Sequence, residues 1–553
     1  MENEEIVRRF SKLESERKTV EQIWQVIEEY ITPYRGKFFR DESDEHSIEW
    51  SRRKVFDSTA IVAHQTLSAS LHGALTSPAI RWFDMRFRTE KLNKNKRALQ
   101  WIQGVAERVH YELQDSNFNL EINEAYQDLV GPGTAFMTLE EDRPDIKEWT
   151  GLNFSSVPLK EGYFEQDDKG KTLRFYRSLE WTAGQIIARF GPAGLPDDII
   201  EQEKAGSTNK NKVIFAIFPR QNRIENIRNL NRKEAPSKRP WEYRYVLKNG
   251  AITLGKPGGY YEMPAFAARW RKTSSSIWGN SPSMLAIYDV LTLNEARHMQ
   301  LLMAEKLIDP PILAEERAIV SDLSMKAGTL NIIRSRAGIE VFDSKGSLPV
   351  SDHMIEQLQQ AVKDYFFIDQ LRMPHQQAQP MTATEIQMRH EQMQRQLGPT
   401  LGRIANDLLD PIISRTVRML ARAGELEDPP PVVIEEDAEW DIIYLGSLQR
   451  AQKTDEAASV ERLVMMVGNL AQVMPDMLLT LDQAEIVRHI GRSLNVPAGI
   501  MLDAEEVKAK QEEQQAKQEA AMQAQQAQME GEAMEAQGKG QQAMMGGQNA
   551  GPQ

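Results

Sequence analysis

The sequence has 553 residues, a formal net charge of −13 and no cysteine. That length suffices for three or four structural units, and the missing thiols exclude disulfides, thiolate catalysis and cysteine-ligated metals. The longest wholly apolar run, residues 213–218, is far too short to cross a membrane, so no membrane partner is expected. Proteins that grip nucleic acid through its phosphates are usually basic, so this acidic chain should repel DNA more than hold it.

The first 130 residues predict mainly helices. Residues 2–31 carry apolar side chains at three/four spacing, namely Ile6, Phe10, Leu13, Val20, Trp24, Ile27 and Ile31. Residues 57–75, rich in Ala, Ser and Leu, predict a second helix, and residues 82–87 alternate like a strand. The helical pattern returns in 99–114 and 120–130.

The next 150 residues predict a mixture of strands and helix. Gly131-Pro132-Gly133-Thr134-Ala135 is a tight turn leading into a strand, and Thr182 is the expected N-cap of a short helix ending at Phe190. Asp167-Asp168 and Asp197-Asp198 lie beside Gly or Pro and indicate turns more than a catalytic carboxylate pair. Further strands are predicted at 154–158, 173–178, 213–219 and 243–247.

Long helices dominate the region from Ser281 to Gly424. Ser281-Pro282 starts a helix that Asp309-Pro310-Pro311 ends, because Ser caps free amides and Pro cannot continue a helix. Residues 330–342 predict two short strands around Ala337-Gly338. A helix at 351–371 and a Gln- and Pro-rich loop at 372–383 lead to a helix at 384–423, which Gly398-Pro399 should kink.

The C-terminal part changes in character. No Phe, Trp or Tyr follows Tyr444, although helical patterns continue to about residue 502. Residues 503–553 are rich in Gln, Ala, Glu and Met and cannot build a core, so we expect disorder or a helix formed only in an assembly.

No motif predicts catalysis, a cofactor or a metal. The Gly131–Ala135 segment lacks the spacing of phosphate-binding loops, and no Lys-Ser/Thr pair follows it. His390-Glu391 begins like a zinc-binding H-E-x-x-H motif, but position 394 is Gln. The nine histidines show no ligand spacing.

Several short landmarks follow one another along the chain. They are Ser77-Pro78 with Arg81-Trp82-Phe83; Gly131 to Ala135; Arg269-Trp270 and Trp278-Gly279-Asn280-Ser281-Pro282; Ala304-Glu305-Lys306 with Pro310-Pro311; Thr382-Ala383-Thr384-Glu385; Leu397-Gly398-Pro399; and Arg450-Ala451-Gln452-Lys453. In this order they resemble the head-to-tail connector, or portal, family of short-tailed bacteriophages over about residues 1–510. Asn280 departs from the family pattern, where Arg is expected before Ser-Pro.

The resemblance implies a predominantly helical α+β portal fold. Its parts would be a wing (1–280), stem helices (281–308 and 351–371), a clip (309–350), a tunnel loop (372–383), a kinked helix (384–423), a crown (424–502) and a Gln-rich tail (503–553), which would form a barrel helix or be disordered. It also implies a ring of about twelve copies at one capsid vertex of the virion, assembled in the host cytoplasm. Expected partners are the DNA that passes through, the terminase packaging motor, tail adaptors, and capsid and scaffolding proteins.

By the same resemblance, two groups of residues are candidate sites. Arg372, His375, Gln376, Gln377 and Gln379 would face the channel, presenting a mostly neutral polar surface that contacts phosphates without holding them. Asn331, Ile333, Arg334, Arg336 and Glu340 would form a docking surface on the clip.

Two other classes of function remain open from the sequence. One is an acidic oligomeric scaffolding or tail-adaptor protein without a DNA channel. The other is an enzyme with an unrecognised site, although no nucleophile, metal cluster or phosphate loop converges anywhere in the sequence.

Overall fold

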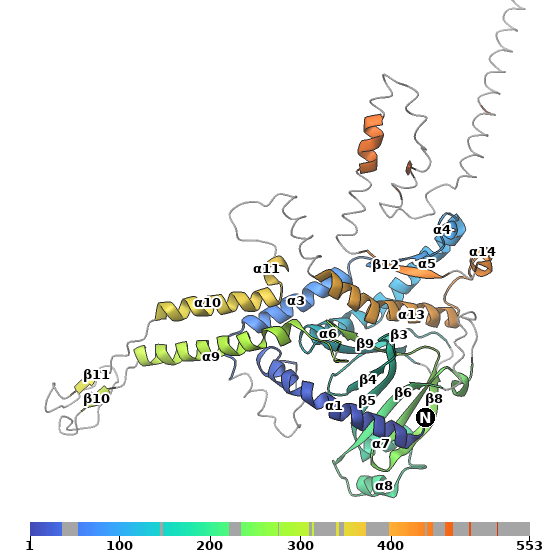
Figure 1. Ribbon diagram of the computed structural model, residues 1–553. Helices are drawn as coiled ribbons and strands as arrows, with labels where there is room; N and C mark the ends of the chain where they lie inside the picture. The colour runs from blue at the N-terminus through green and yellow to red at the C-terminus, as the bar shows by residue number, and fades with distance from the viewer. Residues whose placement is uncertain are drawn as a thin grey trace, which may run out of the picture. The chain divides into compact units, whose positions relative to one another are not determined.

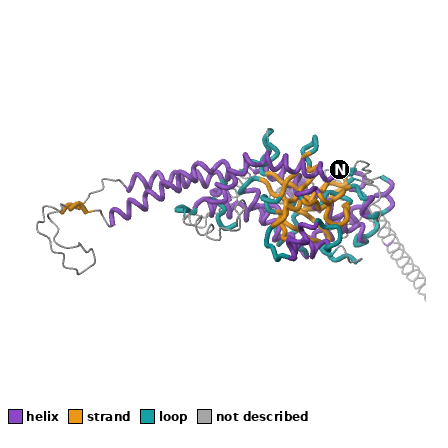
Figure 2. Tube along the Cα trace, turned by 90° about the horizontal axis from the view of Figure 1, so that it is seen from below, coloured by secondary structure: helices purple, strands orange, loops and turns teal. Residues whose placement is uncertain are grey.

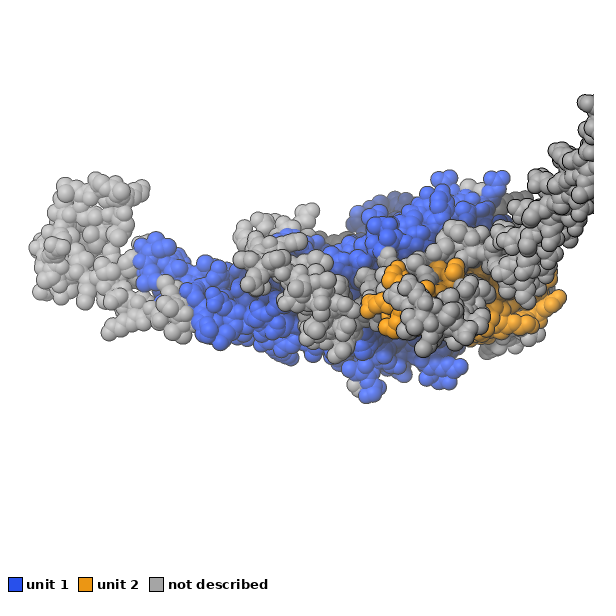
Figure 3. Space-filling view, turned by 90° about the horizontal axis from the view of Figure 1, so that it is seen from above, with its two compact units in different colours: residues 1–85, 104–428, 442–448 blue, residues 86–103, 429–441, 449–553 orange. Residues whose placement is uncertain are grey.

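The computed structural model describes residues 1–35, 54–143, 148–220, 234–274, 276–308, 312–314, 339–341, 348–371, 397–436, 439–445 and 459–467, with 486–487, 491 and 517 further on. The fold mixes helix and sheet, so the α+β class is confirmed (Figure 1). The chain divides into two compact units, one of residues 1–85, 104–428 and 442–448 and one of 86–103, 429–441 and 449–553 (Figure 3).

Helices occupy most of the first 130 residues, as predicted. The helices are α1 (Asn3–Tyr30), α3 (Thr59–Leu75), α4 (Glu90–Asn93), α5 (Lys96–Asp115) and α6 (Phe118–Val130), with strand β1 (Phe83–Phe87) before α4. The buried apolar side chains of α1 are those with the predicted three/four spacing, namely Ile6, Phe10, Leu13, Trp24 and Ile27. The periodicity therefore located the face that the helix buries.

Two antiparallel sheets form the centre of the larger unit. The three-stranded sheet has the order β3 (Leu152–Val157), β2 (Thr134–Glu141), β9 (Ala265–Arg269). The five-stranded sheet is a meander of β4 (Gly162–Gln166), β5 (Thr172–Thr182), β6 (Lys210–Pro219), β7 (Trp241–Leu247) and β8 (Ile252–Tyr260). Strands β4, β8 and β9 were not predicted, since none shows a clear apolar alternation.

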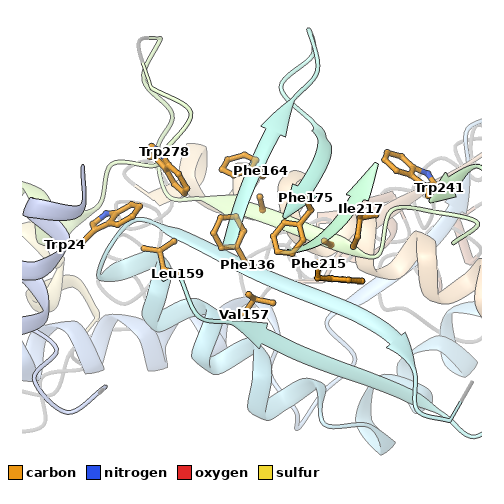
Figure 4. Close-up of a cluster of buried hydrophobic side chains, with 12 residues drawn as sticks. Trp24, Phe136, Val157, Leu159, Phe164, Phe175, Phe215, Ile217, Trp241 and Trp278 are labelled. Atoms are coloured by element: carbon orange, nitrogen blue, oxygen red, sulfur yellow. The ribbon is translucent and has the colours of Figure 1, made fainter. Parts of the chain in front are cut away.

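A hydrophobic core joins side chains of both sheets (Figure 4). Phe136 of β2 packs edge-on against Phe164 of β4 and Phe175 of β5, each with ring centroids 5.5 Å apart. Trp278 approaches Phe164 in the same T-shaped geometry, also at 5.5 Å. These edge-to-face contacts are the favoured arrangement of aromatic rings and fix one sheet against the other.

Strand β6 is buried on both of its faces. Phe215 and Ile217 belong to the core between the sheets, whereas Ile214 and Phe218 pack in a second cluster with Ile6, Phe10 and Leu13 of α1. A strand covered on both sides needs apolar residues at every position, which explains the continuous run at 213–218.

Two short helices lie in sequence between strands β5 and β6 of the five-stranded sheet. α7 (Ala183–Phe190) begins with the predicted cap, because Thr182 and Gln185 form a reciprocal capping box.

Of the two turns predicted at paired aspartates, one is present. Asp167 forms the predicted turn by accepting the Lys169 and Lys171 amides at 3.0 and 2.7 Å. The turn predicted at Asp197-Asp198 is wrong, because both residues lie in the first turn of α8 (Asp197–Lys204), where carboxylates favour a helix N-terminus.

A long hairpin of two helices leads to a small β element (Figure 2). α9 spans Pro282–Ile308 and α10 spans Leu348–Tyr365, and the two lie side by side. Strand β11 (Ile339–Val341) falls within the predicted 330–342 segment, but its partner is β10 (Ile312–Ala314) of the same chain. The strand partner of β11 thus lies more than 20 residues earlier in the sequence, and not across a hairpin at Ala337-Gly338.

The helix predicted at 351–371 is interrupted. α10 starts earlier, at Leu348, and ends at Tyr365, and α11 (Ile368–Leu371) resumes beyond a break. Phe367 in the break has φ of 57°, in the left-handed region that non-glycine residues rarely adopt. Phe366 is fully buried, so packing of this ring outweighs the tendency of the helix to continue.

The third long helix is described from Leu397 onward. It contains a π-helical turn at Ala405–Leu409, which runs into α13 (Asp410–Ala423) with Pro411 in the first turn. Pro411 has no amide to donate, which accounts for an irregular turn there, and no irregularity was predicted at this position. The expected crown region contains α14 (Pro431–Glu435) and strand β12 (Trp440–Tyr444), which was not predicted; β12 pairs with β1.

Candidate functional site: the helical hairpin and its anchor

The start of α9 is fixed by hydrogen bonds to the turn that precedes β2. The Ser281 hydroxyl donates to the Gly131 carbonyl at 2.5 Å and accepts from the Met284 amide at 3.1 Å, so it is the predicted cap. The Ser283 hydroxyl donates to the Val130 carbonyl at 2.8 Å. Both serines are fully buried, so these bonds exclude water and hold the helix at one position.

Two glycines let this anchor form. Gly133 has φ of +87°, and its backbone lies directly against that of Gly279. A Cβ atom at Gly279 would lie 2.0 Å from the Gly133 carbonyl oxygen, which no side chain can tolerate. The turn at Gly131–Thr134 is therefore a close-packing element under the hairpin, as the predicted tight turn requires.

A short segment before α3 also fastens the hairpin. The Asn294 side chain accepts the Phe56 amide at 2.7 Å and donates to the Lys54 carbonyl at 2.9 Å. The Phe56 ring stacks on His298 with centroids 4.2 Å apart and planes 10° from parallel. The Asn294 amide thus satisfies two backbone groups of this segment, as a neighbouring strand would, and holds the segment against the middle of α9.

Polar contacts join the two helices of the hairpin along their length. The Gln300 amide of α9 donates to the Asp352 carboxylate of α10. Asp289 of α9 accepts from Tyr365 of α10, and this carboxylate raises the pKa of the Tyr365 hydroxyl. Since these pairs lie near opposite ends of α10, the helices run antiparallel as a single rod.

The described part of the third helix is held by buried charges. Asp407, in the π-helical turn, pairs with Arg269 of β9 at 3.0 Å, and both side chains are largely buried. Arg415 donates to the Leu139 carbonyl at 3.1 Å and to Glu262, and burial lowers the pKa of its guanidinium. Breaking such a pair leaves an uncompensated charge, so these contacts fix the helix against the sheets.

A row of exposed apolar side chains follows one side of α9. Leu285, Tyr288, Met299 and Leu302 are between 43% and 76% exposed and share a three/four repeat with Thr292 and Glu295. Leu301, Leu307 and Ile308 add exposed surface towards the end of the helix, where Ile308 is 84% exposed. A helix that is apolar on every side is normally buried all round, so among the described residues α9 has no packing partner on this side. We call Leu285, Tyr288, Met299 and Leu302 the α9 stripe.

The exposed side of α10 has a different chemistry. Its exposed side chains include Asp352, Glu356, Gln357, Gln360 and Asp364. This surface, which we call the α10 polar face, combines carboxylates with neutral amides.

The residues predicted to form the channel loop lie outside the described residues, namely Arg372, His375, Gln376, Gln377 and Gln379. The same holds for Asn331, Ile333, Arg334 and Arg336 of the predicted clip, whereas Glu340 belongs to the backbone of β11. Gly398 and Pro399 lie in helix, but the preceding turn is not described, so the kink stays a prediction. The α9 stripe was not predicted. The sequence of α9 has apolar residues on every side of the helix, and this pattern could have indicated it.

No chemical centre emerges in the described residues. Among them, no group of three or more His, Cys, Asp or Glu side chains is placed to hold a metal ion. In the same part of the chain, no helix combines the length and apolarity needed to cross a bilayer.

Comparisons with known proteins agree with a structural role. The family described as "Bacteriophage head to tail connecting protein" matches residues 3–502. The chain is similar to a "Probable portal protein" of Bordetella phage BPP-1, with 27% identity over 86% of this chain and 84% of the relative. It is also similar to the "Portal protein" of Salmonella phage epsilon15, with 24% identity over 92% of this chain and 90% of the relative. Because the family match spans nearly the whole chain, the protein belongs to the bacteriophage head-to-tail connecting proteins, a structural family.

Proposed function

We propose that copies of this chain form a closed ring of about twelve subunits at one capsid vertex, with a central channel for double-stranded DNA. The two relatives named portal proteins, each aligned over most of its length, support this role. In the virion the ring links capsid to tail. We further propose that it nucleates shell assembly with capsid and scaffolding proteins and docks the terminase motor and tail adaptors.

The α9 stripe is the observation that carries the proposal. In a cyclic ring each subunit offers one surface to the next subunit and a different surface to the previous one. The stripe supplies an elongated apolar surface along a rigid rod, and a neighbouring copy would cover it. Burial of four large side chains in every interface would favour closure of the ring.

The α10 polar face fits the lining of the channel. Carboxylates such as Asp352 and Asp364 repel phosphates, and the uncharged side chains of Gln357 and Gln360 attract phosphates less than Lys or Arg would. DNA could then slide without being held. The loop at 372–383 and the clip residues Asn331 to Glu340 remain part of this proposal as channel and docking surfaces.

Ring formation by purified protein tests the proposal. We expect light scattering and negative-stain micrographs to show rings with a central hole. The triple variant Leu285→Gln, Tyr288→Gln, Met299→Gln should stay folded, because all three side chains are exposed, but remain monomeric. The control Ile23→Gln, Val62→Gln, Tyr111→Gln changes side chains of similar exposure elsewhere and should still form rings.

Four results would contradict the proposal or a part of it. Wild-type protein that is only monomeric at micromolar concentration would argue against assembly by this chain alone. Rings from the stripe variant would place the subunit interface elsewhere. A closed assembly without a hole would favour a scaffolding or adaptor role, and nucleotide hydrolysis by the isolated protein, which we do not expect, would favour an enzyme.

A further inference from the structure

One short segment of this acidic protein is strongly basic. Residues 86–97 contain six Lys or Arg side chains and a single carboxylate, Glu90. We call this segment the basic platform, and its cations are Arg86, Arg88, Lys91, Lys94, Lys96 and Arg97. It comprises the end of β1, helix α4 and the start of α5.

The basic platform is a built element of the smaller unit. The Asn93 side chain donates to the Phe87 carbonyl at 2.7 Å and accepts the Phe87 amide at 3.1 Å, which folds α4 back on β1. Phe87 is buried and stacks on Trp101 with planes 14° apart. The Asn95 side chain caps α5 by accepting the Ala98 amide at 3.1 Å. The cations are thus carried on an ordered support.

A distant acidic segment of the same unit is seated on the basic platform. Asp441 accepts from Arg88 at 2.7 Å, and Glu439 pairs with the same guanidinium. Glu436 pairs with Lys91 at 2.6 Å. The Arg88 amide also donates to the Glu439 carbonyl at 3.0 Å, so the two segments are in register. We call the described residues of this segment, 435–436 and 439–441, the acidic strand.

We propose that the basic platform binds the phosphate backbone of double-stranded DNA and that the acidic strand occupies this site as a built-in competitor. The ion pairs between them are exposed to solvent, so they are weak and screened by salt. Lys94 and Arg97 of the platform are exposed beside these pairs and offer further cations. A DNA duplex presents one negative charge about every 1.7 Å of its axis, far more than the acidic strand does.

The composition of the surface favours DNA over an acidic peptide. The apolar residues of the platform, Phe87 and Leu92, are both buried, so only polar and charged side chains face solvent. Peptide recognition normally needs pockets for side chains, whereas binding to phosphates needs only suitably placed charges. This inference takes from the proposed function only that DNA comes near the protein.

Fluorescence anisotropy with a labelled duplex of about 30 base pairs, titrated with the full chain at several salt concentrations, tests the inference. The freed variant Glu436→Gln, Glu439→Gln, Asp441→Asn should bind DNA roughly three- to tenfold more tightly than wild type, with a steeper salt dependence. Adding Lys94→Gln and Arg97→Gln to the freed variant should remove most of that gain. The charge-matched control Asp197→Asn, Asp198→Asn, Glu201→Gln on α8 should change affinity less than about twofold.

Three outcomes would overturn the inference. If the freed variant and the control gained DNA affinity equally, the gain would come from the change in net charge and not from the platform. No tightening in the freed variant would mean that the platform is not a phosphate site. Preference of the freed variant for polyglutamate over DNA would assign the platform to an acidic protein partner. Ring formation is scored separately in micrographs. If rings form but the freed variant binds DNA no more tightly, this inference fails and the proposed ring stands. If the protein stays monomeric but the freed variant binds DNA more tightly, the proposed ring fails and this inference stands.

Discussion

The contact between Gly279 and Gly133 gives a sharp test of the hairpin anchor. In Gly279→Ala the new methyl carbon would lie 2.0 Å from the Gly133 carbonyl oxygen and 2.9 Å from its carbon. Both are backbone atoms, so the two chains must move apart. That movement strains two hydrogen bonds of 2.8 Å, the buried one from the Gly279 amide to Thr134 Oγ1 and a second from the Asn280 amide to the Arg271 carbonyl.

The expected loss of stability follows from these contacts. Overpacking costs about 1–3 kcal/mol, and each buried donor left without a partner adds about 1–3 kcal/mol. We therefore expect Gly279→Ala to lower the free energy of unfolding by about 2–5 kcal/mol and, for a unit of this size, the Tm by about 2–6 °C. Circular dichroism during thermal unfolding measures this change.

A second glycine supplies a matched control. Gly402 lies in helix with open space around its Cα, so Gly402→Ala should raise stability by about 0.5–1 kcal/mol. The same substitution thus has opposite signs at the two positions. If Gly279→Ala melted within a degree of wild type, the two backbones would not be in contact and the anchor described above would be wrong.

Three further predictions address the channel, the tail and a buried carboxyl group. Replacing the channel-loop glutamines with lysine should leave rings intact but slow DNA packaging and ejection, most strongly at low salt, because added cations hold phosphates; ejection rates that match wild type at every ionic strength would place the loop outside the channel. The changes are Gln376→Lys, Gln377→Lys and Gln379→Lys. Truncation after Gly531 should preserve rings in micrographs, since the removed segment lacks aromatic and periodic apolar residues; loss of assembly would show that the tail takes part in it. Burial raises the pKa of Asp128 to about 6 from 3.8, so the folded protein binds its proton more tightly, and this group's contribution to stability falls as pH rises from about 4 to 6. Asp128→Asn should lack that fall in urea titrations, and identical pH profiles would mean that Asp128 does not titrate in this window.

Local patterns in the sequence were sufficient for much of the secondary structure. Helices α1 and α9 were predicted almost to their ends, because the one-sided apolar spacing of α1 and, for α9, Ser281 as a cap and Pro310 as a stop all act within a few residues. The capping box at Thr182 was predictable for the same reason. The sequence also carried the family landmarks, from which the head-to-tail connecting role followed.

Tertiary packing decided the remaining features. Strands β8 and β9 exist because neighbouring strands satisfy their backbone groups, and their own side chains carry little signal. Phe367 takes a left-handed conformation because burial of the neighbouring Phe366 outweighs helix propensity.

The candidate surfaces depended on the same kind of long-range information. Periodicity cannot distinguish an apolar side chain that the chain buries from one that awaits another subunit, so the α9 stripe is visible only once α9 has packed. The acidic strand meets the basic platform across about 350 residues of sequence, as in Arg88 with Glu439. By itself the sequence determined the helices, their caps and the family, since these follow from neighbouring residues and shared landmarks. Only the tertiary structure decided which surfaces stay exposed, because exposure depends on every element that packs nearby.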